Sequence, residues 1–170
     1  RHLKIIAGNK TLVDTTGFSL HAGEAHLLVG ASGSGKTLTA RSLLGVMPAG
    51  ANVASAELIV TLENGRELKP YASLPRQRAV EKQFRILRGD VIGYLPQDAR
   101  GSLDPLMRIG AQVSSCLSLN DTNESVNGCL KRSGFEAPEK VAKLYPHELS
   151  GGMAQRAGIA MLLARGSKFV

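Results

Sequence analysis

The sequence predicts an α/β fold in which short strands alternate with helices, and three observations support this. The apolar run "AHLLVG" (25–30) leads into a glycine-rich turn, and helical spacing follows in "TLTARSLLGV" (37–46). Residues 56–68 alternate in polarity around Asn64-Gly65, which is the strongest short signal of a hairpin. From 109 to 143 the pattern changes to short helices with polar joints.

Short strands and turns are expected in the first 30 residues. "LKII" (3–6) and "FSL" (18–20) are strand-like, "AGN" and "HAGE" are typical of turns, and 25–30 is expected to be a buried strand. Pro48 and Gly50 in "MPAGANV" end the helix that follows. We therefore expect a region of short strands and turns that leads into a strand–helix core.

The second half of the chain combines one more strand with several helices. "VIGYLP" is expected to be a strand. Helices are expected in "IGAQVSSCLSL", "NESVNGCLKRSGF", "PEKVAKL" and "MAQRAGIAMLLAR", and "SKFV" is expected to begin another buried strand. The whole is interpreted as one domain, divided into a core at 1–97, a helical insert at 98–150, and a final helix with a return to the core at 151–170.

Composition excludes little on its own. The chain has 170 residues and a net charge of +7, which favours anions, but nucleotide, nucleic acid and an acidic membrane surface all satisfy it. No apolar run approaches the ~20 residues of a membrane span, and no export leader is recognised. Cys116 and Cys129 lack metal-ligand spacing and are interpreted as reduced thiols.

The glycine-rich turn "GASGSGKT" (30–37, the phosphate loop) matches G-x-x-x-x-G-K-[ST] and stands between a predicted strand and a predicted helix. Its backbone N–H groups form a nest for phosphates, Lys36 supplies a cation to the β- and γ-phosphates, and the Thr37 hydroxyl is a ligand for Mg²⁺. A chance glycine turn is the alternative. The predicted nucleotide-binding residues are Gly30, Ser32, Gly33, Ser34, Gly35, Lys36, Thr37 and Leu38.

A second glycine-rich turn, "LSGGMAQR" (149–156, the signature segment), also runs into a helix. Ser150 offers a hydroxyl, and Gly151 and Gly152 leave their amides accessible at the positive end of a helix. The alternative is a serine N-cap that starts a buried helix, and both interpretations can hold together. One nucleotide needs only one such cradle.

The phosphate loop, the segment "VIGYLPQDARGSLDP" (91–105) and the signature segment, in this order, resemble the ATP-binding cassette (ABC) ATPases over essentially the whole chain. The resemblance implies an α/β P-loop NTPase core with a mostly parallel sheet, an N-terminal antiparallel β region and an α-helical signature subdomain. It also implies head-to-tail dimers, with each ATP held between the phosphate loop of one subunit and the signature of the other. Ser150, Gly151 and Gly152 then act on a partner's ATP. The resemblance assigns Lys36 and Gln97 to catalysis, and Thr37 and Gln97 to Mg²⁺.

Finer features resemble the peptide/nickel importer group within this family. They are "LLGVMPAG", "PQDARGSLDPLMRIGAQV" and "LYPHELSGGMAQR", with Met153 where the family usually has Gln. The implied protein is the ATPase subunit of an importer for peptide, nickel or a metal–metallophore, peripheral at the cytoplasmic face of the inner membrane. Its implied partners are a second ABC ATPase subunit, the membrane permease and, indirectly, an extracytoplasmic substrate-binding protein, with no nucleic acid.

Two alternatives stay open. The first is a soluble ABC ATPase of DNA repair, chromosome organisation or translation. The resemblance implies a long coiled coil between the two glycine-rich motifs in repair and chromosome ATPases, and 38–148 carries no sustained heptads, so this alternative is disfavoured. A plain P-loop kinase would lack the helical insert.

Two departures from the family pattern matter. The family usually stacks adenine on an aromatic side chain near the N-terminal strand, and this place falls at Ile5, Ile6 or Ala7, where no aromatic stands. Residues 1–170 also lack the Asp that helps to hold Mg²⁺ and the Glu that polarises water. We therefore expect a part of a longer ATPase that, on its own, is a nucleotide-binding module without turnover.

Several other residues receive structural interpretations. His147 is expected to cap or pack rather than to catalyse. Asp98 and Asp104 have no second ligand set nearby that would suggest a metal. The basic cluster, interpreted as a solvated helix face, comprises Arg76, Arg78, Lys82, Arg85 and Arg88.

Overall fold

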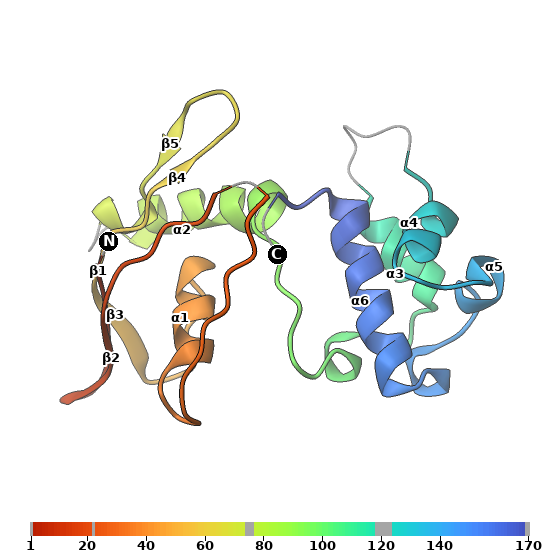
Figure 1. Cartoon of the computed structure of the whole chain (residues 1–170), viewed down its shortest axis with the longest axis horizontal. Helices are drawn as coiled ribbons and strands as arrows, with labels where there is room; N and C mark the ends of the chain where they lie inside the picture. The colour runs from red at the N-terminus through yellow and green to blue at the C-terminus, as the bar shows by residue number, and fades with distance from the viewer. Residues whose placement is uncertain (1, 22, 74–76, 118–123, 169–170) are drawn as a thin grey trace. The chain divides into compact units, whose positions relative to one another are not determined.

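The computed structural model describes residues 2–21, 23–73, 77–117 and 124–168. The chain forms two compact units, 1–88 and 89–170, each of which is described by itself (Figure 1). The division of the domain at 97 and 150 stays a prediction.

The N-terminal unit contains a three-stranded antiparallel sheet in the order β2-β1-β3. The strands are β1 (His2–Ala7), β2 (Lys10–Thr16) and β3 (Ala51–Ala56). Ile5 of β1 pairs with Val13 and with Val53, and its side chain is fully buried. The antiparallel β region is confirmed. β3, however, lies partly in 47–53, which the sequence pattern marks only as a helix break.

A short hairpin follows, as Asn64-Gly65 predicts. β4 (Val60–Thr61) pairs antiparallel with β5 (Glu67–Leu68). Gly65 has φ 77°, and the Asn64 side-chain oxygen accepts a hydrogen bond from the Arg66 N–H at 3.1 Å. The turn chemistry therefore fixes the hairpin, although the paired strands are shorter than the alternating pattern.

Three helical segments pack together in the same unit: α1 (Lys36–Leu43), the 3₁₀ turn η1 (Pro70–Ser73) and α2 (Gln77–Ile86). The Tyr71 hydroxyl donates to the Ser42 carbonyl at 2.5 Å, and burial raises the pKa of Tyr71, so the phenol stays a donor. The ring of Tyr71 meets Phe84 edge to face at 5.0 Å. These contacts hold the C-terminal end of α1, the helix that begins in the phosphate loop.

Gly45 ends α1 at a site where only glycine fits. Its φ is +65°, and a Cβ there would lie 2.6 Å from the Phe84 ring. We expect Gly45→Ala to lower the free energy of unfolding by about 2–4 kcal/mol, combining left-handed backbone strain with overpacking. Gly50→Ala is the matched control, because Gly50 also has positive φ but open space around it. Urea unfolding measures both, and equal losses would contradict the role of Phe84.

The parallel core sheet is not formed among the described residues. Residues 18–20, 25–30 and 91–96 are not assigned as strands, and both described sheets are antiparallel. Leu27 is 88% exposed and Val29 is 79% exposed. The expectation of a buried strand at 25–30 is therefore wrong for this structure, because a strand requires a hydrogen-bonded neighbour and 25–30 has no backbone partner among the described residues.

The C-terminal unit is helical. A π-helical turn, η2 (Leu87–Val91), joins the two units, and the rest comprises η3 (Arg100–Ser102), α3 (Ile109–Cys116), α4 (Val126–Arg132), α5 (Pro138–Val141), η4 (Pro146–Glu148) and α6 (Gly151–Arg165). Figure 1 shows α3 and α4 beside α6, and the contacts between these elements agree. The helical insert and the final helix are confirmed as elements.

The core of this unit forms along α6. Ala154, Ala157, Ala160 and Ala164 follow a helical spacing and are all buried. Small side chains on one face allow close approach of α3 and α4, which contribute Ile109, Val113 and Leu130 to the same cluster. The expected strand at 167–170 lies partly outside the described residues. Lys168 there donates its N–H to the Val91 carbonyl at 2.9 Å. No helix in the described ranges has the length and apolar character that crossing a bilayer requires.

Candidate nucleotide-binding site

The phosphate loop is shaped by its glycines. Gly33 and Gly35 have φ of 80° and 91°, which side-chain-bearing residues rarely adopt. A Cβ on Gly35 would lie 2.4 Å from Val13 of β2, and one on Gly30 would lie 2.6 Å from the Ser34 hydroxyl. Gly35 is therefore required both for the backbone conformation and for the close approach to β2, and Gly33 is required for the backbone conformation.

The N-terminus of α1 leaves its donors without protein partners. Gly35 is the N-cap and supplies no side-chain hydrogen bond, and the first turn contains no acidic residue. The first intrahelical bond runs from the Thr39 N–H to the Gly35 carbonyl at 2.8 Å, and no described group accepts from the N–H groups of 35–38. Four donors and the positive end of the helix dipole thus converge at 35–38, which suits an anion.

Lys36 lies back over the same loop. Its Nζ donates to the Gly30 carbonyl at 2.6 Å and to the Ala31 carbonyl at 2.8 Å. The ammonium is therefore fixed across the phosphate loop without an acidic partner among the described residues. A bound phosphate would exchange two neutral acceptors for charged ones, and charge-assisted hydrogen bonds are about twice as strong.

The signature segment begins α6 with a serine cap. Ser150 is the N-cap, and its hydroxyl accepts a hydrogen bond from the Met153 N–H at 3.2 Å. Leu149 beside it is buried, and its carbonyl accepts a hydrogen bond from the Arg100 guanidinium. The capping interpretation of Ser150 is confirmed, and the phosphate-binding interpretation stays a prediction.

Nothing in the described structure explains the two glycines of the signature segment. Gly151 and Gly152 are exposed, their φ values are not positive, and no atom lies within 4 Å of a Cβ built on either. Glycine is a poor helix former, with a cost of about 1 kcal/mol relative to alanine in a helix interior, so helix stability does not explain two glycines in the first turn. Glycine at both positions leaves the helix N-terminus open to close approach by an external group.

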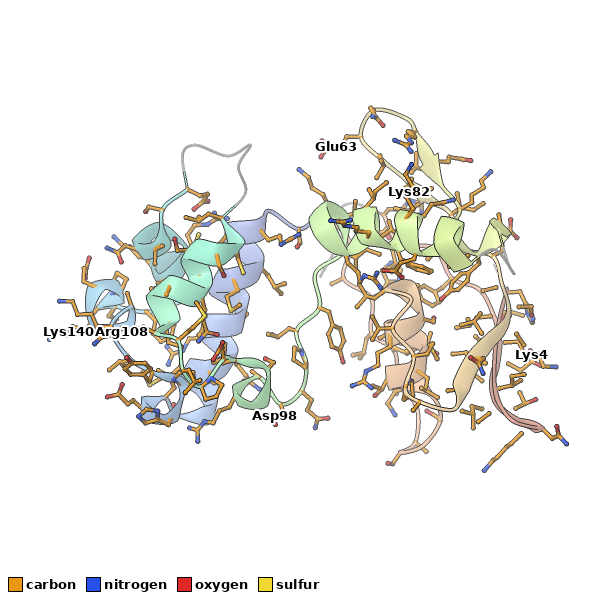
Figure 2. The ribbon with its side chains drawn as sticks, turned by 180° about the vertical axis from the view of Figure 1, so that it is seen from behind. Lys4, Glu63, Lys82, Asp98, Arg108 and Lys140 are labelled. Carbon is orange, nitrogen blue, oxygen red and sulfur yellow. The ribbon has the colours of Figure 1, made fainter. Side chains whose placement is uncertain are left out.

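Gln97 precedes a braced polar loop. The Gln97 side chain is exposed and has no hydrogen-bond partner among the described residues. Asp98, beside η3 in Figure 2, accepts from the Gly101 N–H at 2.9 Å. Asp104 accepts from the Leu106 N–H at 2.9 Å, and buried Gln112 bonds the backbone on either side of it. Both aspartates therefore have structural roles in turns.

The described contacts bring the site residues together in two groups. Gly30, Ser32, Gly33, Ser34, Gly35, Lys36, Thr37 and Leu38 lie in the N-terminal unit, and Gln97, Ser150, Gly151 and Gly152 lie in the C-terminal unit. Arg100 links the segment after Gln97 to the signature segment. Each unit thus carries one glycine-rich turn at the start of a helix.

The family comparison covers nearly the whole chain. Residues 13–170 match the family model described as ABC transporter. The chain belongs to the ABC transporter family. The resemblance drawn from the three motifs is confirmed, and so is the P-loop NTPase fold class that it implies.

Curated ABC transporter proteins show the same relationship. The chain is 39% identical over 163 residues to the oligopeptide transport ATP-binding protein OppD of Escherichia coli (strain K12), covering 92% of this chain and 44% of that protein. It is 34% identical over 165 residues to the dipeptide transport ATP-binding protein DppD of Lactococcus lactis subsp. cremoris (strain MG1363), covering 93% and 44%. The chain thus spans less than half the length of these relatives.

One feature of this ABC transporter chain escaped sequence reasoning. His147 was expected to cap or pack, and its ring stacks on Tyr145 with centroids 5.7 Å apart and planes 13° apart. The Arg108 guanidinium carbon lies 5.3 Å from the centroid of the same Tyr145 ring. The contact between Arg108 and Tyr145 joins residues that are far apart along the chain, and it therefore has no local sequence signal.

The basic cluster is a helix face only in part. Lys82 (labelled in Figure 2) and Arg85 are exposed on α2, whereas Arg88 donates to the Leu44 carbonyl at 3.1 Å and pairs with Glu81. Arg76 and the side chain of Arg78 lie outside the described residues.

Proposed function

We propose that this chain is the nucleotide-binding part of an ABC importer ATPase that binds Mg·ATP at the phosphate loop. The observation that carries the proposal is the uncapped N-terminus of α1 beneath Lys36. Four N–H groups without partners among the described residues, together with one ammonium, offer hydrogen bonds and positive charge to the oxygens of a triphosphate. ATP-binding is also part of the names of the curated relatives.

The residues present fit a magnesium ion. Thr37 stands in the first turn of α1, is exposed, and has no hydrogen-bond partner for its hydroxyl among the described residues. Thr39, by contrast, donates its hydroxyl to the Gly35 carbonyl at 3.0 Å. We propose Thr37 as a ligand, and the assignment of Gln97 to the same ion, which the family resemblance implies, stays a prediction. The ion supplies neutralisation of phosphate charge, and Lys36 adds to it.

The signature segment is proposed to contact the ATP of a second ABC ATPase subunit. Gly151 and Gly152 keep the start of α6 open, and Ser150 adds a hydroxyl there. A helix N-terminus that its own unit leaves uncovered suits a phosphate carried by a partner. In this proposal, pairing of two subunits around two nucleotides drives the membrane permease.

Peptide is the proposed cargo class. The curated relatives at 39% and 34% identity are named for oligopeptide and dipeptide transport. Nickel and metal–metallophore uptake are the other cargoes of the group that the sequence resembles. The proposed location is peripheral, on the cytoplasmic face of the inner membrane, with the substrate-binding protein acting indirectly through the permease.

The 170-residue chain by itself is proposed to bind nucleotide without turnover. Within 1–170 no apolar run is followed by the acidic pair that the resemblance calls for in magnesium binding and water activation. General base catalysis contributes about 10²–10⁴-fold, so we expect phosphate release at background level. A steady-state phosphate assay tests this. Release that disappears in Lys36→Ala would contradict it.

Isolation of the whole protein from membranes tests the importer proposal. We expect a tagged copy to co-purify with a polytopic permease and to hydrolyse ATP faster when that permease is supplied with peptide-loaded binding protein. Stable nucleic-acid binding without any permease would instead favour the soluble ABC ATPases of DNA repair, chromosome organisation or translation. Stimulation by nickel rather than peptide would correct the cargo alone.

A further inference from the structure

An exposed aromatic stack stands immediately before the signature segment. His147 lies on the Tyr145 ring at 5.7 Å with nearly parallel planes, and Arg108 (labelled in Figure 2) lies 5.3 Å from the same ring. Tyr145 is half-buried, whereas His147 and Arg108 are exposed. The Tyr145 ring is therefore held by two contacts, and the exposed imidazole of His147 lies beside it.

The backbone beneath the stack is held rigidly. Glu148 accepts a hydrogen bond from the Tyr145 N–H at 2.7 Å, and its own N–H donates to the Tyr145 carbonyl at 3.0 Å. Pro146 restricts the turn further, and η4 ends at buried Leu149. His147 is thus an ordered ring on the surface rather than a loose side chain, and ordering it again on binding costs little.

The position of the ring relates it to the proposed phosphate contact. Three residues span at most about 10 Å, so the His147 backbone lies within that distance of Ser150. The ribose and phosphates of one nucleotide bridge a gap of this size. A ring so placed can meet the base of a nucleotide whose terminal phosphate lies at Ser150.

The three positions where the family resemblance places an adenine-stacking ring carry no aromatic side chain. Ile5, Ile6 and Ala7 are aliphatic, and Ile5 is fully buried in the sheet. Aromatic side chains stack on any base without needing a sequence-specific hydrogen bond, and a cation nearby adds to the attraction. His147 offers the aromatic ring, and the Arg108 guanidinium, which contacts the same Tyr145 ring, offers a cation nearby.

We propose that His147 stacks on the adenine of the ATP bound by the partner subunit, and that Tyr145 and Arg108 are positioning residues for it. The proposal rests on the proposed function, because it requires the signature segment to act on a partner's nucleotide. It makes His147 a determinant of base recognition, separate from the phosphate contact of Ser150.

Nucleotide-driven pairing of the whole protein tests the proposal with two probes, ATP and the base-free ribose 5-triphosphate. We expect His147→Ala to raise the ATP concentration for half-maximal pairing by about tenfold, within the range that one base stack contributes. The concentration of ribose 5-triphosphate for half-maximal pairing should stay the same in His147→Ala as in wild type. His147→Phe keeps a stacking ring and should behave as wild type with both probes.

Each other outcome has a defined meaning. The inference alone is overturned if His147→Ala shifts half-maximal pairing equally with both probes or with neither. It is also overturned if His147→Phe needs more ATP for half-maximal pairing than wild type while its thermal melting is unchanged. Failure of the wild-type protein to pair with ATP overturns the proposed function and this inference with it. If the wild-type protein pairs with ATP, Ser150→Ala abolishes pairing and His147→Ala does not change it, the proposed function is kept and the base contact is rejected.

Discussion

Lys36→Ala is expected to lower the affinity of the single subunit for ATP by about 100-fold. Lys36 crosses the phosphate loop and donates to the Gly30 and Ala31 carbonyls. A hydrogen bond to a charged group contributes about 1.5–3 kcal/mol, and 1.4 kcal/mol is tenfold in affinity. Removing the ammonium therefore leaves the four N–H groups of α1 to hold the triphosphate alone.

A matched lysine separates this effect from general charge. Lys82 stands exposed on α2 and has no ion-pair partner among the described residues (Figure 2). Lys82→Ala removes the same charge from the same unit and should change ATP affinity less than about twofold, because Lys82 is exposed and salt screens the interactions of exposed charges. Calorimetric titration measures both variants. Similar losses in the two would mean that the phosphate loop is not the site.

Ser150→Ala is expected to lower ATP turnover by the whole protein with its permease by about 10²-fold, the loss typical of removing one donor to transition-state charge. The same change removes the cap on the Met153 N–H, which costs about 1 kcal/mol of stability. Two roles are therefore lost at once, and the simple variant does not separate them.

Ser150→Asp separates the two roles. Aspartate caps helices as well as serine does, so the free energy of unfolding should stay near that of wild type. Its carboxylate would nevertheless repel a phosphate at the same N-terminus, and turnover should stay low. Ser150→Thr keeps the hydroxyl and should keep both properties. Full turnover in Ser150→Asp would reduce Ser150 to a structural cap.

The sequence predicted local features of the fold well and paired strands poorly. Asn64-Gly65 specifies its own turn, and the apolar spacing of 153–165 specifies α6, so both were predicted correctly. The pairing of β1 with β3 depends on residues about 50 positions apart, and "MPAGANV" hides the start of β3 behind a proline and a glycine. Residues 25–30 have the composition of a buried strand, but composition cannot supply the neighbouring strand that burial requires.

The candidate site divides in the same way. The phosphate loop was predictable from its glycine spacing, and at Gly35 a positive φ and a close approach to Val13 explain why glycine stands there. The contact of Arg108 with Tyr145 was not predictable, because 108 and 145 meet only through packing of the helical unit. Motif spacing therefore locates the phosphate contacts, whereas the surface beside them has to be read from the structure.

In the proposed function, the two glycine-rich turns serve two different nucleotides. Its most direct test measures ATP binding by isolated subunits and ATP-driven pairing of subunits, side by side, in Lys36→Ala and Ser150→Asp. We predict that Lys36→Ala loses ATP binding by the isolated subunit, and that Ser150→Asp keeps this affinity and loses only pairing. Equal loss of single-subunit affinity in both variants would contradict the claim, because both turns would then hold the same phosphates.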